Sequence, residues 1–229
     1  MINRLSYVFQ IILLIKNLIF NNSFNEINVL KNHIKNDSLI VDIGSNQGLF
    51  IKFIEKIIKN KKLNIYSIDA SERCIEIQNR KNFKNNINLK LFNLAISETV
   101  GLVSFFERKI ISNSSLNENH KLTGGLDSVE KKIQSTTLDK FCKDQNIYSI
   151  DLLKIDCEGF DYNVLKSSKE LLENNRIKMI KIEVLNTEDN FVNIVNLLNL
   201  HNLSLIGLTN LNYISGELNF FDAYFQLQK

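Results

Sequence analysis

Short apolar runs and amphipathic stretches alternate along most of this 229-residue chain. Runs rich in β-branched and apolar residues, which are typical of buried strands, lie at 39–41, 65–68, 89–96, 102–106, 150–155, 177–184, 203–208 and 220–227. Apolar positions at helical spacing predict helices over 24–35, 49–59, 71–83, 138–144, 160–173 and 189–200. This alternation predicts an α/β fold with a doubly wound sheet, in which ligands bind at the carboxyl ends of the strands.

The first twenty residues form an apolar stretch with one polar side, which carries Ser6, Gln10 and Asn17. Lys16 interrupts the apolar run and no cleavage site of small residues follows, which argues against a secretory signal. The stretch is also too short and too polar to span a bilayer. We expect a helix over 1–20 that packs on the domain or on a second copy of the chain, giving a homodimer; contact with a membrane surface is the alternative.

The rest of the chain shows no linker, no internal repeat and no second domain. We therefore predict one domain at 37–229 and an N-terminal helical extension at 1–36. The segment 109–132 has no apolar periodicity and is rich in Ser and Asn. Segments of this length in compact domains are usually functional or disordered, so a mobile insertion and a substrate lid are both open interpretations.

Composition narrows the class of protein without deciding its function. Charged residues make up 23% of the chain and the formal net charge is +3. Acidic and basic residues are thus nearly balanced, which does not indicate a nucleic-acid-binding protein. Cys74, Cys142 and Cys157 are far apart and form no Cys-x-x-Cys pair, so neither a disulfide framework nor a structural zinc site is indicated. A reducing, cytoplasmic location is the expectation.

The strongest local motif is VDIGSNQG at 41–48. An apolar strand ends at Asp42, and Gly44 and Gly48 frame a turn that opens the next helix. Glycines let a ligand approach the backbone closely, and a helix N-terminus presents free N–H groups. The Gly-x-Gly-x-x-Gly spacing of dinucleotide-binding folds is absent. A carboxylate at Asp42 would repel a pyrophosphate but suits a ligand with an ammonium and a sulfonium group, and S-adenosylmethionine carries both.

A second acidic residue, Asp69, ends the apolar run 65–68. A carboxylate at the end of the second strand can accept hydrogen bonds from both hydroxyls of a ribose. The alternative is a carboxylate that caps the helix beginning after Ser71. The nearby glycine turn and Asp42 favour the ribose interpretation.

A third acidic group follows the run 150–155, in the segment KIDCEG at 154–159. The doubly wound topology places this strand beside the first one. Asp156 and Glu158, with Lys154 just before them, can orient or deprotonate a hydroxyl nucleophile. They can equally hold a divalent cation such as Mg²⁺ through oxygen ligands, with Glu183 as a third ligand. Simple stabilisation of a helix N-terminus by acids is the remaining alternative.

The segments VDIGSNQG, IYSIDAS, NLAIS, STTLDKF and DLLKIDCEGFDYNVL, in this order and spacing, resemble the FkbM-type family of S-adenosylmethionine-dependent methyltransferases. The resemblance runs from about 38 to 183 and includes the family's V-D-I-G-x-N-x-G turn, T-L-D run and K-x-D-x-E-G segment. Two positions depart from the family pattern. Asp69-Ala70 stands where Glu-Pro is frequent, which bears on how the ribose is held, and Asp161 stands where Glu is frequent.

The resemblance implies a class I methyltransferase fold, which is a Rossmann-like, mostly parallel sheet of seven strands whose last strand, here 220–227, is antiparallel. It implies that the methionine part of S-adenosylmethionine is cradled by Asp42, Gly44, Asn46 and Gly48. It also implies that Asp69 binds the ribose and that the adenine lies near Asn93, Leu94 and Ala95. The transferred methyl group would be bordered by Lys154, Asp156 and Glu158.

Members of this family typically methylate hydroxyls, often on sugars of natural products or cell-surface polysaccharides. We therefore expect O-methylation of a small-molecule or glycan acceptor, and no nucleic-acid partner. In-line displacement needs alignment of the acceptor oxygen and a base or cation beside it, for which Asp156 is the first candidate and Glu158 the second. The alternatives are a non-catalytic binding protein that keeps the fold and a dinucleotide-dependent oxidoreductase.

Overall fold

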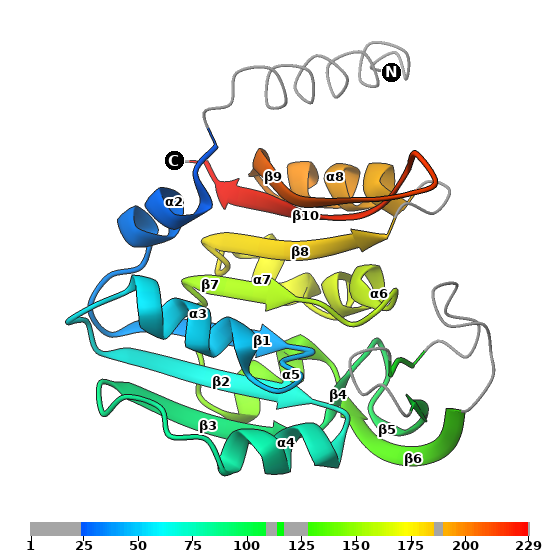
Figure 1. The fold of residues 1–229 in the computed structure, drawn as a ribbon. Helices are drawn as coiled ribbons and strands as arrows, with labels where there is room; N and C mark the ends of the chain where they lie inside the picture. Colours follow the sequence, from blue (N-terminus) through cyan, green and yellow to red (C-terminus); the bar gives the residue numbers. More distant parts are fainter. Residues whose placement is uncertain (1–23, 109–113, 117–127, 186–189, 229) are drawn as a thin grey trace.

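The computed structural model describes residues 24–108, 114–116, 128–185 and 190–228. The helix predicted over 1–20 and most of the aperiodic segment 109–132 lie outside the described residues. Figure 1 shows a large central sheet with helices on both faces and a smaller sheet near one end of its strands.

The large sheet has seven strands, which are β1 (Ser38–Ile43), β2 (Leu63–Asp69), β3 (Ile87–Asn93), β7 (Leu152–Ile155), β8 (Met179–Leu185), β9 (Leu203–Ile214) and β10 (Glu217–Leu227). Their order across the sheet is β3-β2-β1-β7-β8-β10-β9. The parallel strands are β3, β2, β1, β7 and β8, and β10 runs antiparallel to both of its neighbours, β8 and β9. The predicted doubly wound, mostly parallel sheet with an antiparallel last strand is confirmed.

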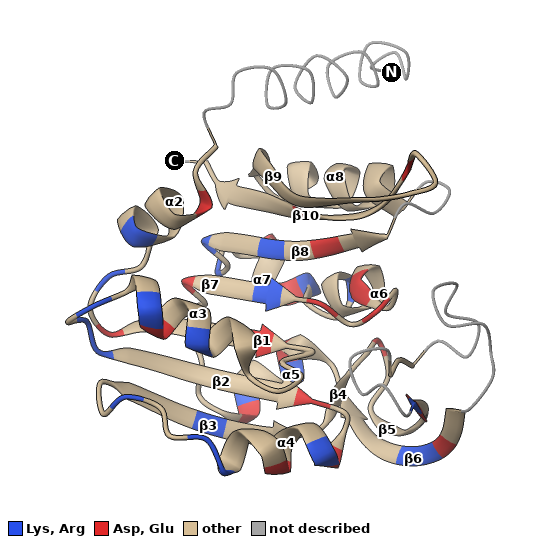
Figure 2. Cartoon of the chain, in the orientation of Figure 1, with Lys and Arg blue, Asp and Glu red and all other residues tan. Residues whose placement is uncertain are grey.

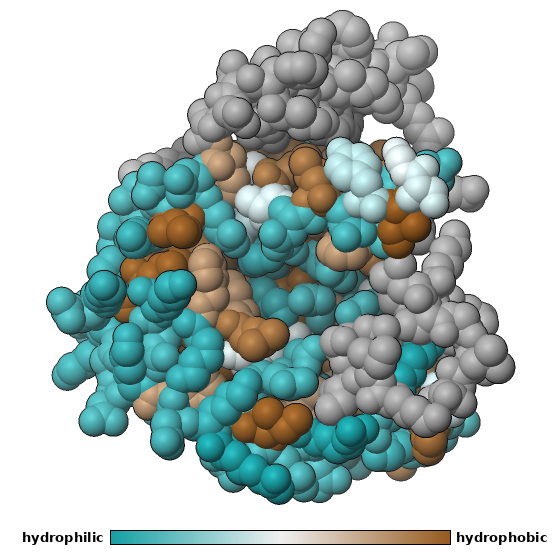
Figure 3. Space-filling model, viewed as in Figure 1, coloured by the Kyte–Doolittle hydropathy of each residue, from teal (hydrophilic) through white to brown (hydrophobic). Residues whose placement is uncertain are grey.

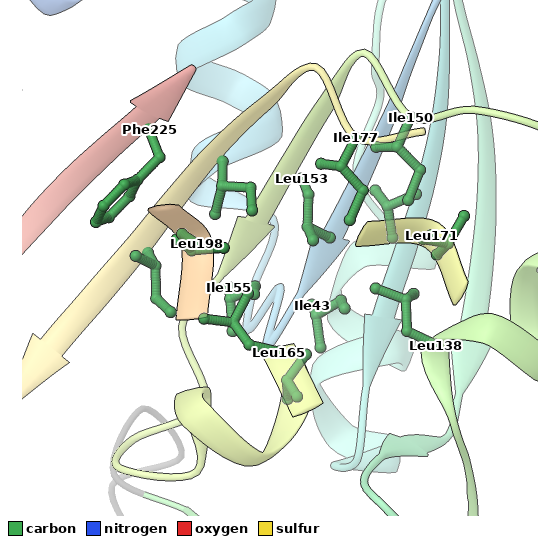
Figure 4. Close-up of a cluster of buried hydrophobic side chains, with 14 of the residues drawn as sticks. Ile43, Leu138, Ile150, Leu153, Ile155, Leu165, Leu171, Ile177, Leu198 and Phe225 are labelled. Carbon is green, nitrogen blue, oxygen red and sulfur yellow. The ribbon is translucent and has the colours of Figure 1, made fainter. Parts of the chain in front are cut away.

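One face of this sheet is covered by α5 (Leu138–Asp144), α6 (Asp161–Lys166), α7 (Lys169–Glu173) and α8 (Asn190–Leu200). Figure 4 shows Ile43, Leu153 and Ile155 of the central strands among side chains of these helices, including Leu165 and Leu198. The central strands are buried on both sides, which explains why most of their residues are apolar.

The opposite face is covered by α2 (Glu26–His33), α3 (Leu49–Ile57) and α4 (Glu72–Asn79). Leu30 of α2 and Ile51 and Ile54 of α3 are fully buried against Ile40 and Ile65 of the sheet. The two apolar layers fix β1 and β7 side by side, so the residues that follow these strands meet at one edge of the sheet.

A second sheet has three strands, β4 (Ala95–Ile96), β5 (Gly101–Arg108) and β6 (Ser128–Thr136), in the order β4-β6-β5. The predicted strand 89–96 therefore splits, because the chain leaves the large sheet after Asn93 and β4 pairs with β6 instead. Strand β6 was not predicted from the sequence. Most of its residues are exposed or half-buried, so it lacks the apolar alternation that marks a buried strand.

Two further predictions are corrected by the structure. The single helix expected over 160–173 is divided into α6 and α7. At the division the hydroxyls of Ser167 and Ser168 donate to the carbonyl oxygens of Val164 and Leu165, a local bonding pattern that competes with helix continuation. The strand expected over 203–208 continues to Ile214, and a tight turn with positive φ at Ser215 and Gly216 leads into β10.

None of the described helices is long and apolar enough to cross a membrane. On the face drawn in Figure 3, the described hydrophobic residues appear in small groups among hydrophilic ones.

Candidate functional site

A cavity lies at the edge of the large sheet where the carboxyl ends of β1, β2 and β7 meet the small sheet. Its lining includes a majority of the residues predicted for the site, namely Gly44, Asn46, Asp69, Leu94, Ala95, Asp156 and Glu158. The other predicted residues lie close to this cavity without lining it, and they are Asp42, Gly48, Asn93, Lys154 and Glu183. The structure thus brings together residues from three separate motifs.

The turn after β1 requires glycine at two positions. Gly44 has a φ of +67°, and a Cβ atom there would lie only 1.8 Å from the backbone oxygen of Asp156. Only glycine therefore lets this turn approach the turn after β7 so closely. Gly48, with a φ of +74°, immediately precedes α3, and Asn46 adopts the left-handed conformation that asparagine tolerates well.

Gln78 of α4 holds this turn, and the sequence analysis did not identify it. Its amide nitrogen donates to Ser45 Oγ at 2.8 Å and to the backbone oxygen of Asn46 at 2.7 Å. Its amide oxygen accepts from Ser67 Oγ at 2.8 Å. Gln78 is almost completely buried. A polar residue one helical turn after Cys74, in the buried stripe of α4, is the sequence signal that could have revealed it.

Asp42 is fully buried beneath the turn, where its partner is Lys154. The ammonium of Lys154 lies 3.1 Å from Asp42 Oδ1 and 3.3 Å from Asp156 Oδ2, and it donates to the backbone oxygen of Gly44 at 2.7 Å. Neither oxygen of Asp42 accepts a well-aligned hydrogen bond from a described residue. Lys154 therefore ties β1, the glycine turn and the turn after β7 together.

The protonation of Asp42 and Lys154 is governed by their burial and by the charged groups beside them. Burial raises the pKa of Asp42 above its usual value, and the nearby Lys154 opposes this shift. Burial alone would lower the pKa of Lys154, but the carboxylates of Asp156 and Asp42 raise it above the ordinary value. The Lys154 side chain therefore remains a charged ammonium throughout the physiological range.

Asp69 faces the cavity and also organises the backbone around it. Its Oδ2 accepts from the backbone N–H of Asn46 at 2.7 Å, and its Oδ1 accepts from that of Ser71 at 2.8 Å. Burial raises the pKa of Asp69 to about 6, although these two hydrogen bonds oppose the shift. Each carboxylate oxygen keeps a second lone pair, so the geometry accommodates both predicted roles, capping and acceptance of ribose hydroxyls.

The wall next to Asp69 is apolar. Leu94 and Ala95 line it together with Ile96 of β4 and Phe105 of β5. Asn93 lies behind this wall, because its amide donates to the backbone oxygens of Asp69 and Ala70 at 3.1 and 3.0 Å. Asn93 thus holds the ends of β2 and β3 together. Phe105 belongs to the small sheet, whose position sequence periodicity could not place.

The turn after β7 is organised by Asp161, the first residue of α6. Its carboxylate accepts from the backbone N–H of Cys157 at 2.7 Å and from that of Gly159 at 3.0 Å. Between these two residues, Glu158 adopts a φ of +51°. Burial, followed by the charge of Asp156, raises the pKa of Asp161 to about 7.

Asp156, Glu158 and Glu183 come together as predicted, with one carboxylate oxygen of each within 4.8 Å of the others. Figure 2 shows acidic residues on β8 and in the turn after β7, next to lysines on the same two strands. Burial, reinforced by the charges of Asp156 and Asp161, raises the pKa of Glu183 well above its usual value. Such a cluster can share protons or hold a divalent cation through its oxygens.

The small sheet and the segment after β5 contribute three contacts that were not predicted from the sequence. Ser71 Oγ donates to Glu107 of β5 at 2.9 Å, and Lys131 of β6 donates to the same carboxylate at 2.6 Å. In the cavity wall, Ser115 Oγ donates to the backbone oxygen of Glu158 at 2.8 Å. These contacts join residues far apart in the sequence, and Ser115 belongs to the aperiodic segment, so no local pattern indicated them.

A model of the methyltransferase FkbM domain matches residues 42–215, from the buried acid of β1 to the turn between β9 and β10. The chain belongs to the FkbM methyltransferase family. The resemblance expected from the sequence motifs is thereby confirmed, and it extends beyond them to the hairpin of β9 and β10. Membership of a methyltransferase family also argues against the dinucleotide-dependent oxidoreductase.

A solved methyltransferase structure shares this fold. An FkbM methyltransferase from Methylobacillus flagellatus KT is 13% identical with a TM-score of 0.59, and the match covers 91% of this chain and 47% of that one. This FkbM-family chain thus spans about half the length of that protein. An rRNA methylase from Streptococcus thermophilus is 16% identical with a TM-score of 0.48, covering 88% and 94% of the two chains. M. capricolum TrmK, solved with S-adenosyl-homocysteine, is 13% identical with a TM-score of 0.47, covering 90% and 69%. No match was found among curated proteins.

Proposed function

We propose that this FkbM-family protein transfers the methyl group of S-adenosylmethionine to a hydroxyl on a sugar of a polysaccharide or natural-product precursor. The observation that carries the proposal is one cavity with two chemically different ends. Asp69 and an apolar wall line one end, and Gly44, Asp156 and Glu158 line the other. The first end suits a nucleoside, and the second suits the reacting groups.

The described residues fit this cofactor. The unused lone pairs of Asp69 can accept the ribose hydroxyls, and the wall at Leu94 and Ala95 suits the adenine ring. Gly44 lines the cavity and presents only backbone atoms to it. When bound, the cofactor supplies a methyl group on a sulfonium sulfur, which is a good leaving group.

Asp156 is our first candidate for the base. Its side chain is 38% exposed, so an acceptor hydroxyl can reach it, and its carboxylate would take the hydroxyl proton as the new carbon–oxygen bond forms. Glu158 is the second candidate. Burial and the neighbouring carboxylates raise the pKa of Glu183, which favours its protonated form and makes it a poorer candidate for the base. Lys154 is committed to three partners, and we assign it a positioning role instead of contact with the methyl group.

A divalent cation such as Mg²⁺ is a second proposal for the same carboxylates. Asp156, Glu158 and Glu183 offer three oxygens close together, and Oε2 of Glu183 has no hydrogen-bond partner among the described residues. A cation held there would favour the ionised form of an acceptor hydroxyl. In that case the proton goes to solvent and Asp156 is a ligand.

The charge at this end of the cavity supports a neutral acceptor. The carboxylates of Asp156 and Glu158 would repel a phosphate group close to the reacting hydroxyl. A neutral small-molecule or glycan acceptor meets no such repulsion. The acidic end of the cavity therefore supports a sugar acceptor over a nucleic acid. The membrane and homodimer contacts of residues 1–20 stay predictions.

Two measurements test the proposed function. Calorimetric titration should show binding of S-adenosyl-homocysteine and no binding of NAD. Transfer of a radiolabelled methyl group from S-adenosylmethionine is then measured on a panel of neutral methyl glycosides, with an RNA oligonucleotide as the comparison acceptor. We expect transfer to at least one glycoside, and a strong loss in Asp156→Asn. Binding without any transfer would favour the non-catalytic alternative, and transfer to RNA alone would refute the acceptor class.

The same assay separates the two proposals for the carboxylates. If a cation is required, EDTA abolishes transfer and Mg²⁺ restores it. If Asp156 acts as the base without a metal, EDTA has no effect on transfer.

A further inference from the structure

The backbone of Glu158 has a conformation that its surroundings must maintain. A φ of +51° lies in the left-handed region, which is unfavourable for residues other than glycine. Such conformations persist where neighbouring groups hold them, and they often occur at functional sites. Asp161 supplies part of this support, because its carboxylate binds the N–H groups of Cys157 and Gly159 on either side of Glu158.

Further support comes from Ser115, which lies on a different part of the chain. Its hydroxyl donates to the carbonyl oxygen of Glu158 at 2.8 Å and lies 3.5 Å from that of Cys157. Ser115 is 2% exposed, so water does not compete for this bond. The carbonyl of Glu158 is therefore fixed by the segment between β5 and β6, while the flanking N–H groups are fixed by α6.

Ser115 has its own anchor on the small sheet. Its backbone forms a bridge to Phe106 of β5, with hydrogen bonds of 2.9 and 3.3 Å in the two directions. The preceding hydroxyl, that of Ser114, accepts from the backbone N–H of Arg108 at 2.9 Å. Because β5 holds Ser115 in place, its hydroxyl has a defined position from which to hold Glu158.

We propose that Ser115 is a positioning residue for methyl transfer: its hydroxyl holds the Glu158 peptide in the left-handed conformation and so keeps the Glu158 carboxylate beside Asp156 and Glu183. This inference rests on the proposed function. Rotation of the Glu158 peptide toward the right-handed region would turn the side chain away from the other two carboxylates. Ser115 also lines the cavity, so a wall of the cofactor site and the carboxylate arrangement depend on the same residue.

The small number of glycines makes a direct spectroscopic test practical. The chain has 8 glycines, so labelling with ¹⁵N-glycine gives a simple amide spectrum. The amide nitrogen of Gly159 is bonded to the carbonyl carbon of Glu158, so its resonance reports the hydrogen bond from Ser115. We expect Ser115→Ala to move the Gly159 resonance and leave those of Gly101 and Gly216 in place.

Two further variants control this experiment. Ser115→Thr keeps a hydroxyl and should leave Gly159 close to its wild-type position. Ser104→Ala removes a serine hydroxyl of β5 that donates to Glu130 on the exposed side of the small sheet, and it should leave the Gly159 resonance unchanged. An unmoved Gly159 resonance in Ser115→Ala would overturn the proposal.

Kinetics with the glycoside acceptor test the consequence for transfer. We expect Ser115→Ala to lower kcat roughly ten- to a hundredfold, because small displacements of a positioned group cost about this much. The KM for S-adenosylmethionine and the affinity for S-adenosyl-homocysteine should stay within about twofold, and Ser115→Thr should recover kcat. A loss confined to cofactor affinity would refute the positioning role.

Failure of this inference can be distinguished from failure of the proposed function. If wild-type protein binds no S-adenosyl-homocysteine, the proposed function fails whatever Ser115 does. If wild-type protein binds the ligand and transfers the methyl group, while Ser115→Ala keeps both the Gly159 resonance and kcat, only the inference on Ser115 fails.

Discussion

Replacement of Lys154 by methionine tests whether this residue holds the site together. Methionine keeps an unbranched side chain but removes the ammonium. The fully buried Asp42 then loses a partner at 3.1 Å, and the carbonyl of Gly44 loses its donor at 2.7 Å. Removing one partner of a buried ion pair costs about 3–5 kcal/mol, because the other charge is left without compensation. A whole domain has a stability of about 5–15 kcal/mol, so the expected loss is large.

The assay is urea unfolding followed by circular dichroism at neutral pH. The matched control is Lys178→Met, because Lys178 pairs with Asp151 at 2.6 Å but its side chain is 52% exposed. Such exposed pairs contribute about 0–1 kcal/mol, so the control should unfold almost like the wild type. The double variant Asp42→Asn/Lys154→Met removes both charges and should be more stable than Lys154→Met alone.

Two outcomes would refute this reasoning. One is an unfolding free energy of Lys154→Met equal to that of the Lys178→Met control. The other is a double variant no more stable than the single one, which would mean that the uncompensated Asp42 is not the cause. A folded, fully stable Lys154→Met protein that binds S-adenosyl-homocysteine but transfers no methyl would instead assign Lys154 a direct part in the reaction.

Three further predictions concern the same edge of the sheet. Gly44→Ala should lower the melting temperature much more than Gly216→Ala: both add the cost of a left-handed alanine, about 1–2 kcal/mol, but only Gly44 meets the backbone of Asp156. Asp69→Ala should weaken binding of S-adenosyl-homocysteine at least about tenfold, as measured by calorimetry. At pH values below about 6, where Asp69 is protonated, the wild-type protein should also bind this ligand more weakly. Unchanged affinity in the variant would exclude Asp69 from the ribose site. The pKa of Asp161 is about 7 in the folded protein against an ordinary 3.8, so protonated Asp161 stabilises the fold at low pH and this stabilisation is lost as the pH rises through 7. The urea midpoint should therefore be lower at pH 8 than at pH 6. The difference between the two midpoints should be smaller in Asp161→Asn.

The strands of the large sheet were predictable because burial on both faces demands continuous apolar runs, as at Ile40 and Val41 in β1. The same rule explains why β6 was not predicted, because most of its residues are exposed or half-buried and form no apolar run. The break between α6 and α7 could not be predicted from apolar spacing, because the apolar pattern continues across it. The break is associated with hydrogen bonds from serine hydroxyls to nearby carbonyl oxygens.

The candidate site was predictable where its residues directly follow a strand. Asp69 and Asp156 stand at strand ends, so topology alone places them at one edge. The residues that hold them, Gln78 and Ser115, were not predictable. Their roles depend on contacts with segments more than thirty positions away, and no local pattern encodes such contacts.

The pairing of β1 with β7 has a consequence for synthesis of the chain. The hydrogen bond from Lys154 to Gly44 joins residues 110 positions apart. At a synthesis rate of about 5–20 residues per second, the ribosome needs roughly 5–20 s between making these two residues. During that interval β1 presents an open edge, and unpaired edges promote association with other chains. Substitutions that slow the docking of β7 should therefore reduce the yield of native protein in cells more than equilibrium unfolding would indicate.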